Sequence, residues 1–321
     1  MYSAIVDEVS ATQNNTILLV KSGSRSYGLE HADSDWDAQG IYIGDRARYL
    51  GYRSRSSQFS GKNVDMNYEY TVHEIQKFFE LASACNPNVI EMLFTDPDDI
   101  LTAQWAGLRV RDARNAFLCS RARYSFTGYA MSQLKRIKTH RGWLLTPPKK
   151  KPERADFGLP NDTTLNHDTL VAMEATMSEN ATLIPPAVVQ VWQAERRYQN
   201  AKREFEQYEG WKKNRNKKRA ELERKFGYDT HHGKHLARLL TAGQELLATG
   251  VLPVRAVGDR RKLILSVANG ELSYDSFLSI AQDMHDGTME MKSVLPDRPD
   301  HQSLDDLCQE IILWSMDHVK K

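Results

Sequence analysis

A short apolar run followed by glycine and serine constrains the fold of this chain more than any other feature. The run extends from Ile17 to Val20, and Gly23-Ser24 comes directly after it. A continuous apolar run of this length is typical of a buried strand. Glycine allows the backbone to turn tightly and a phosphate to approach, while the serine offers a hydroxyl and an N–H to that anion. The pattern predicts a buried strand that leads into half of a phosphate site.

Two aspartates follow near the start of a second predicted strand, over residues 36–43. Asp35 and Asp37 are two positions apart, so on a strand both side chains leave the same face, with Cα atoms about twice 3.3 Å apart. Such a pair can clamp Mg²⁺, and two divalent ions are the usual device for phosphoryl transfer, since they align the attacking and leaving oxygens.

A third carboxylate is normally required beside such a pair. Residues 64–70 alternate polar and apolar side chains, which is the period of a strand. Asp65 lies on the polar face of this predicted strand, and we predict that it is the third metal ligand. Glu69 lies on the same face one period further on and is the alternative.

The rest of the chain is predicted to be mainly helical. Thr71 and Glu74 have the spacing of a capping box, which predicts a helix over residues 72–84. Prolines and basic residues predict an extended surface loop over 144–160. Helical periodicity continues over residues 104–140, 187–226, 231–249 and 273–291. With 321 residues the chain is long enough for two domains, and we predict a catalytic domain over 1–105 and a mainly helical domain over 106–321.

The composition is that of an ordinary globular protein. Hydrophobic residues make up 40% and charged residues 26% of the chain, which argues against a disordered or fibrous protein. No apolar stretch approaches the roughly 20 residues of a membrane-spanning helix. The N-terminus lacks the pattern of a signal peptide, and the three cysteines are far apart. We therefore expect a cytoplasmic protein with no membrane partner.

The net charge of +1 hides a segregation of charge along the chain. Residues 109–154 contain thirteen Lys or Arg against two acids, and residues 211–219 contain six with no acid. Residues 283–310 instead hold eight acids against two basic residues. A polyanionic partner such as RNA could use the basic blocks. The candidate RNA-binding residues are Lys212, Lys213, Lys217 and Lys218.

Gly23-Ser24, ten intervening residues and Asp35-Trp36-Asp37 resemble the signature of the DNA polymerase β-like nucleotidyltransferase superfamily. Three further stretches, at residues 86–91, at 227–232 with 235–240, and at 269–274, are similar to one branch of it, the RNA-repair-associated (RlaP-like) proteins of bacteria and phages. The likeness covers most of the chain and is strongest over residues 17–94 and 220–280. It implies an α+β fold, in which a polymerase β-like catalytic domain with a short mixed sheet precedes a mainly helical region.

The resemblance also supports roles for particular residues. Asp35, Asp37 and Asp65 would be catalytic and would hold two Mg²⁺ ions, which Mn²⁺ could replace, while Gly23 and Ser24 would bind the nucleoside triphosphate. Arg25 either contacts the triphosphate or is solvated. The residues that could approach the nucleotide or the acceptor from the second domain are Tyr228, Asp229, His235 and Arg238. The alternative for this helical stretch is packing, and the absence of an adjacent carboxylate argues against zinc at its histidines.

These observations lead to one main hypothesis and two alternatives. The main hypothesis is a Mg²⁺-dependent enzyme that moves a nucleoside monophosphate from an NTP to an RNA end, with tRNA among the candidate acceptors, and releases pyrophosphate. The first alternative is nucleotide transfer to a protein side chain, as in toxin–antitoxin systems. The second is an inactive RNA-binding protein of the same fold, which the intact carboxylate pair argues against.

Overall fold

The computed structural model describes residues 1–52, 56–161, 167–179 and 185–318. The chain divides into two compact units. Unit 1 comprises Met1–Ile137 and Thr230–Lys321, and unit 2 comprises Lys138–Asp229. The predicted boundary at residue 105 therefore falls inside unit 1. The assignment of a catalytic domain to residues 1–105 stays a prediction.

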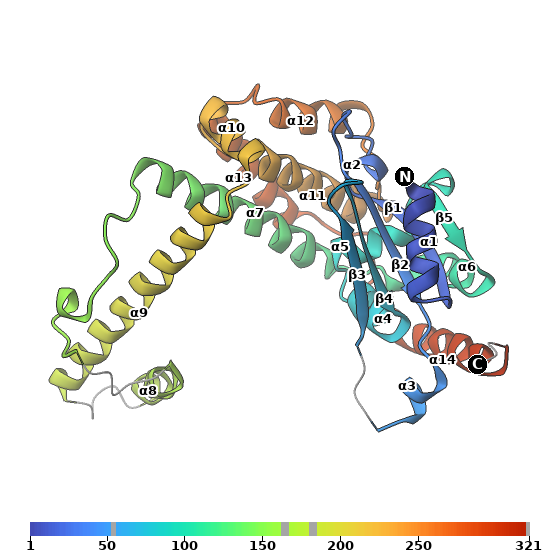
Figure 1. Cartoon of the computed structure of the whole chain (residues 1–321), viewed down its shortest axis with the longest axis horizontal. Coiled ribbons are helices and arrows are strands. Elements are labelled where there is room, and N and C mark those ends of the chain that lie inside the picture. The colour runs from blue at the N-terminus through green and yellow to red at the C-terminus, as the bar shows by residue number, and fades with distance from the viewer. Residues whose placement is uncertain (53–55, 162–166, 180–184, 319–321) are drawn as a thin grey trace. The chain divides into compact units, whose positions relative to one another are not determined.

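Unit 1 is built around one mixed sheet of five strands (Figure 1). The strands are β1 (Thr16–Ser22), β2 (Trp36–Tyr42), β3 (Gln58–Asn63), β4 (Tyr68–Glu74) and β5 (Ile100–Ala103). Their order across the sheet is β3-β4-β2-β1-β5. Only the β2–β4 pair is parallel, and the β1–β2, β1–β5 and β3–β4 pairs are antiparallel. The predicted short mixed sheet is confirmed.

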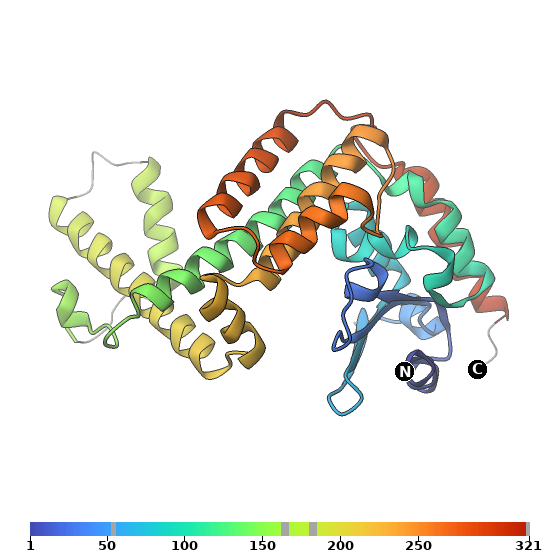
Figure 2. The same cartoon turned by 90° about the horizontal axis from the view of Figure 1, so that it is seen from above.

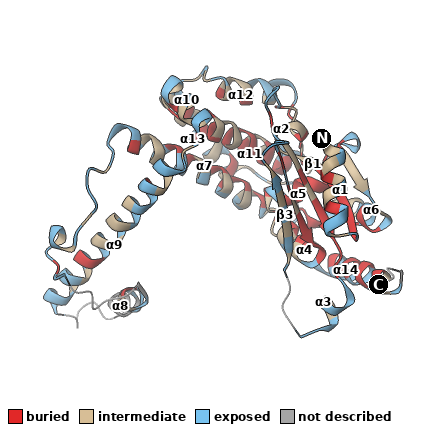
Figure 3. Ribbon diagram, viewed as in Figure 1, coloured by how far each residue is buried: buried red, intermediate tan, exposed pale blue. Residues whose placement is uncertain are grey.

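The apolar run of β1 is buried as predicted, since Ile17, Leu18, Leu19 and Val20 are each at most 1% exposed. Helix α1 (Tyr2–Thr12) contributes Ile5 and Val9 to the core cluster that contains Leu19. Helix α6 (Trp105–Asp112) approaches β1 so closely that a Cβ on Gly107 would lie 2.1 Å from the carbonyl oxygen of Ile17. Figure 3 shows this buried layer in red.

The predicted strand over residues 64–70 is wrong in its first half. Strand β3 ends at Asn63 and β4 begins at Tyr68, and the intervening residues form the turn of a hairpin. The Asn63 side chain accepts a hydrogen bond from the Met66 N–H (2.9 Å), and Asn67 has a φ of +53°. Asparagine favours both features. The alternation of polar and apolar residues therefore runs through a turn before it enters the strand.

The predicted helix after this strand begins later than expected. Strand β4 continues to Glu74, and helix α4 occupies Ile75–Ser83. The Glu74 carboxylate itself caps the helix and accepts a hydrogen bond from the Gln76 N–H at 3.1 Å. The buried face of α4 is the predicted one and consists of Ile75, Phe78, Phe79 and Ala82.

The remaining helices of unit 1 come from both ends of its sequence. They are α2 (Gly23–Ser26), α3 (Arg46–Leu50), α5 (Pro87–Ile90), α11 (Thr230–Thr249), α12 (Gly258–Ala268), α13 (Tyr274–Glu290) and α14 (His301–His318). The C-terminal helices pack against the N-terminal part of the unit (Figure 2). Contacts across more than 200 positions join them, such as the hydrogen bond from the Ala256 N–H to the Tyr27 carbonyl at 2.9 Å.

Helix α7 (Ala122–Leu145) begins in unit 1 and ends in unit 2. The other helices of unit 2 are α8 (His167–Glu179), α9 (Pro186–Lys213) and α10 (Lys217–Phe226). One helical segment was predicted over 187–226, but it is interrupted after Lys213. Asn216 then caps α10 by accepting a hydrogen bond from the Arg219 N–H at 3.3 Å. Across the described ranges of both units, no helix has the length and apolar character needed to cross a membrane.

Candidate functional site

Three carboxylates gather where β2 and β4 begin. Asp35 immediately precedes β2, and Asp37 is its second residue. In the register of the sheet, Asp37 pairs with Ser22 of β1 on one side and with Glu69 of β4 on the other. Because paired residues on neighbouring strands lie side by side, Glu69 extends the pair of aspartates into a row across two strands.

The electrostatics of Asp37 show how closely these carboxylates interact. Burial and then the negative charges of Glu69 and Asp35 raise the pKa of Asp37 to about 6. Lys62 and Arg25 oppose this shift, and Lys62 also forms an exposed ion pair with Glu69 (3.1 Å). Among the neighbouring acids, Glu69 acts on Asp37 more strongly than Asp35 does. The site therefore concentrates negative charge that a divalent cation would neutralise.

The predicted third ligand, Asp65, follows the end of β3 and precedes β4. It is an exposed residue of the β3–β4 turn rather than part of a strand. The sheet register instead places Glu69, the alternative from the sequence, next to Asp37. The physical reason is that the turn takes up residues 64–67, so the strand begins only at Tyr68, and Glu69 is its residue beside Asp37.

The glycine after β1 lies directly against the carboxylate pair. Gly23 has a φ of +66°, and a Cβ built on it would lie 1.9 Å from Oδ2 of Asp37. Only glycine allows both this backbone conformation and this close approach. Gly23 is the first residue of α2, and Ser24 follows it half-buried, with no side-chain hydrogen bond within the described part of the chain. The Ser24 hydroxyl is therefore available to an anion at this turn.

Arg25 has a structural role that neither sequence-based alternative described. Its guanidinium donates hydrogen bonds to the carbonyl oxygens of Ser34 (2.9 Å) and Asp35 (3.3 Å). It also stacks on the Trp36 ring, with its Cζ 3.6 Å from the ring centroid. Arg25 therefore fixes the segment that carries Asp35, close enough to act on the charge of Asp37.

Helix α11 brings His235 and Arg238 into the same unit as the carboxylates. Arg238 is buried, pairs with the buried Glu91, and lies 3.9 Å above the Tyr27 ring. The Tyr27 hydroxyl in turn donates to Glu91 at 3.0 Å. Because Tyr27 is the C-cap of α2, this network supports the turn that begins at Gly23. In this structure Arg238 contributes to the stability of the turn by packing on the Tyr27 ring.

His235 is also held within α11, since its Nε2 lies 3.1 Å from Nε2 of His231. Burial, and then the charges of His231 and Arg238, hold the pKa of His235 well below its usual range. The sequence-based prediction missed Lys234, which directly precedes His235. His231, Lys234, His235 and Arg238 are spaced i, i+3, i+4 and i+7 and form a basic face of the helix. This spacing was visible in the sequence.

The two remaining predicted contacts, Tyr228 and Asp229, are the last residues of unit 2. Both are buried, and burial raises the pKa of Tyr228 to about 12. A fully buried tyrosine of this kind belongs to the packing of the protein. This favours the packing interpretation for Tyr228.

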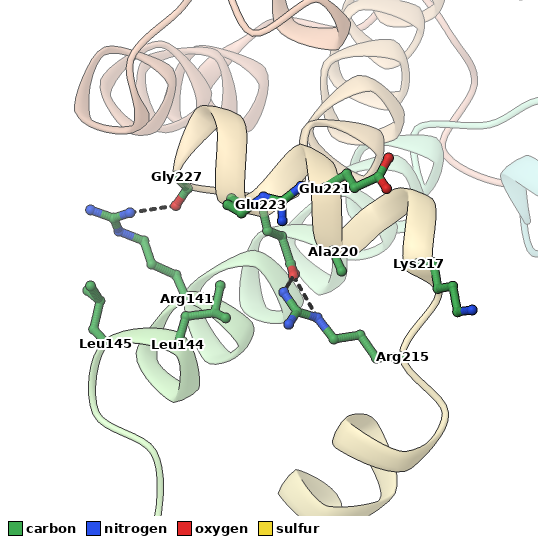
Figure 4. A pocket seen from close by; sticks show the side chains of 10 residues that line it. Arg141, Leu144, Leu145, Arg215, Lys217, Ala220, Glu221, Glu223 and Gly227 are labelled. Carbon is green, nitrogen blue, oxygen red and sulfur yellow. Dashed lines mark hydrogen bonds and ion pairs between the residues drawn. The ribbon is translucent and has the colours of Figure 1, made fainter.

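The predicted RNA-binding residues lie in unit 2, at the end of α9 and the start of α10. Lys212, Lys213, Lys217 and Lys218 are all exposed. Lys217 also borders a pocket of about 580 Å³, whose wall includes Arg141, Arg215 and Arg224. Figure 4 shows that Arg215 is paired with the buried Glu223 and that Arg141 donates to the Gly227 carbonyl. The four lysines are therefore exposed, whereas the neighbouring Arg215 and Arg141 form hydrogen bonds within unit 2.

Several arginines of the other basic block, over residues 109–154, have partners within the protein. Arg109 pairs with Glu310 (3.2 Å) in the acidic segment, and Arg123 donates to the Met289 carbonyl at 2.8 Å. Arg154 pairs with the buried Glu195 at 2.8 Å. Trp143 is buried and packs against Tyr208 and Trp211, with ring centroids 5.8 and 5.4 Å away. These side chains therefore have structural roles, whereas other cations of the same block are exposed, among them Lys135, Arg136, Lys138, Lys149 and Lys151.

Comparison with known protein families gives a match over the N-terminal part of the chain. Residues 2–146 match the model of a family described as RlaP, RNA repair pathway DNA polymerase beta family. No curated protein matches the chain. The matched residues include the whole sheet, the Gly23 turn and all three clustered carboxylates. Over residues 2–146, the chain is therefore similar to the RlaP family of polymerase β-like RNA repair proteins.

Proposed function

We propose that this protein transfers a nucleoside monophosphate from an NTP to the end of an RNA and releases pyrophosphate. The observation that carries the proposal is the convergence of Asp35, Asp37 and Glu69 beside a glycine turn that touches Asp37. Carboxylates next to a phosphate-binding turn are the elements that phosphoryl transfer requires. The family description supports both the reaction class and the RNA repair context.

The donor set suits two magnesium ions. Its ligands would be the oxygens of Asp35, Asp37 and Glu69, and hard oxygen ligands are those that Mg²⁺ prefers. Burial, and then the negative charges of Glu69 and Asp35, raise the pKa of Asp37, and Lys62 and Arg25 do not fully compensate them. When bound, the two ions would neutralise the triphosphate and lower the pKa of the acceptor hydroxyl. Mn²⁺ would fit the same oxygens.

The residues of the chain would bind and orient the reactants. The Gly23 turn and the Ser24 hydroxyl would hold the β- and γ-phosphates. The acceptor hydroxyl oxygen would attack the α-phosphorus while the bond to the bridging oxygen breaks, and pyrophosphate would leave with that oxygen. Glu69 is exposed and could take the proton of the hydroxyl. Catalysis of this kind depends mainly on positioning and charge neutralisation.

The RNA acceptor is supported by unit 2. Its exposed lysines at 212, 213, 217 and 218 could follow a phosphate backbone. None of the four appears in a buried ion pair of the described structure, and only Lys212 has a nearby acid, Glu209 at 4.0 Å. Surface lysines without strong partners can neutralise phosphates at little cost.

A labelling experiment tests the proposal. The protein is incubated with Mg²⁺, each α-labelled NTP in turn, and a mixture of cellular RNA and protein. We expect label in the RNA and none with Asp37→Asn. Label in protein alone would favour transfer to a protein side chain, and no label in either pool would favour the inactive RNA-binding alternative.

A further inference from the structure

The basic face of α11 contains one cation, Lys234, that forms no ion pair with an acidic residue in the part of the chain that the structure describes. Arg238 is paired with Glu91, and the rings of His231 and His235 contact each other. Lys234 lies on the same face, one turn before Arg238. It makes no hydrogen bond or ion pair with any residue in the described ranges, although its side chain is largely shielded from water.

The position of Lys234 follows from the contacts of Arg238. The Arg238 guanidinium lies on the Tyr27 ring, and Tyr27 ends the short helix that begins at Gly23. Residues four positions apart on a helix are neighbours on its surface. Lys234 is therefore next to the residue that packs on the end of this turn, and the charge of Asp37 acts on it.

The environment of Lys234 is suited to an anion. Burial, and then the positive charge of Arg238, lower the pKa of Lys234, while Asp37 opposes this shift. A shielded ammonium group without a partner is costly. A phosphate beside it would supply the missing negative charge and the missing hydrogen-bond acceptors. The nearest anion that the proposed reaction brings to this turn is the triphosphate.

We propose that Lys234 binds the terminal phosphates of the nucleoside triphosphate. This inference rests on the proposed function, because it assigns a residue to the same nucleotide site. The same ammonium group would then neutralise the charge that develops on pyrophosphate as the bond to the α-phosphorus breaks. Lys234 would thus act on the leaving group, while the carboxylates serve the metal ions.

Calorimetry with Mg²⁺ and inorganic tripolyphosphate, and then with each NTP and each NMP, tests the assignment. Lys234→Met should weaken binding of tripolyphosphate and NTP by about 10- to 100-fold, the size expected for a charge-assisted hydrogen bond. Binding of NMP should change less than about twofold, since NMP lacks the terminal phosphates. Lys234→Arg keeps the charge and should recover most of the affinity.

The matched control is Lys292→Met, which changes an exposed lysine of the same unit. It should leave all affinities unchanged. Without nucleotide, the melting temperature of Lys234→Met should equal or exceed that of the parent, because the variant no longer shields an unpaired charge. A fall in melting temperature would instead indicate a structural role and contradict the assignment.

The outcomes separate this inference from the proposed function. If the parent binds NTP and Lys234→Met binds it equally well, Lys234 is not a phosphate contact, and the nucleotide site stands without it. If the parent binds neither NTP nor tripolyphosphate in the presence of Mg²⁺, both the inference and the proposed function fail. Loss of NMP affinity along with NTP affinity would also overturn the assignment to the terminal phosphates.

Discussion

The two compact units use their charged residues in different ways. In unit 1, charges meet in shielded surroundings, as in the buried pair of Arg238 with Glu91 and at Asp37, which is half-buried beside the exposed Asp35 and Glu69. In unit 2, the lysines at 212, 213, 217 and 218 are exposed. Shielded charges interact strongly and can be placed for chemistry, whereas exposed charges gain little from protein partners and remain available to a polyanion. The difference suggests that unit 1 performs the reaction and unit 2 holds the RNA.

The largest expected effect comes from the third carboxylate of unit 1. Glu69→Gln should lower nucleotide transfer by at least about a thousandfold, roughly 4 kcal/mol in the barrier, because it would remove a proposed metal ligand. Asp65→Asn is the matched control four positions away, and its side chain is exposed in the turn. It should stay within about twofold of the parent in single-turnover transfer. The opposite ranking would return the third ligand to Asp65.

The next effect concerns the turn at Gly23. Gly23→Ala should weaken NTP binding by about 10-fold or more, because the new Cβ would displace the Asp37 carboxylate. Gly158→Ala is the matched control in unit 2. Gly158 also has a positive φ, of +70°, but a Cβ there meets nothing within 4 Å. Equal NTP affinities for the two variants, measured by calorimetry, would remove Gly23 from the nucleotide site.

A third prediction addresses unit 2. Changing Lys212, Lys213, Lys217 and Lys218 together to Gln should weaken RNA binding across sequences. The dependence of log K on log salt should flatten by up to about 3, at roughly 0.7 per phosphate contact. NTP binding to unit 1 should not change, and stability should shift by less than about 0.5 kcal/mol. The same RNA affinity and salt dependence as the parent would show that these lysines are only solvated.

The smallest effect is on stability. The folded-state pKa of Asp37, about 6, exceeds its ordinary value of 3.8, so the folded protein loses stability as the pH rises from about 4 to 6. Without metal ions, Asp37→Asn should therefore raise the free energy of unfolding at pH 7.5 by about 1 kcal/mol, after allowance for solvent screening. Urea unfolding should show a smaller gain at pH 4.5. A variant less stable than the parent at pH 7.5 would contradict the repulsion between these carboxylates.

The sequence predicted those parts of the site that depend on local pattern. The apolar run before Gly23 and the spacing of Asp35 and Asp37 identified strands β1 and β2 and the pair of carboxylates. Asp65 was misplaced because polar and apolar residues alternate in a hairpin turn just as they do in a strand. Only the register of β2 with β4 distinguishes Glu69 from Asp65.

Other features depend on contacts between distant parts of the chain. The return of residues 230–321 to the N-terminal part forms unit 1, and no local pattern marks it. The role of Arg25 depends on carbonyl groups nine and ten residues away. Lys234 was missed because its position next to the Gly23 turn becomes visible only through the contact of Arg238 with Tyr27.

The central claim is that the carboxylates of unit 1 catalyse nucleotide transfer to RNA. The most direct test is single-turnover transfer of label from an α-labelled NTP to RNA by the parent and by Asp37→Asn, with RNA binding measured on the same samples. We predict that Asp37→Asn binds RNA as the parent does but transfers at least about a thousandfold more slowly. Transfer by Asp37→Asn at a rate near that of the parent would contradict the claim.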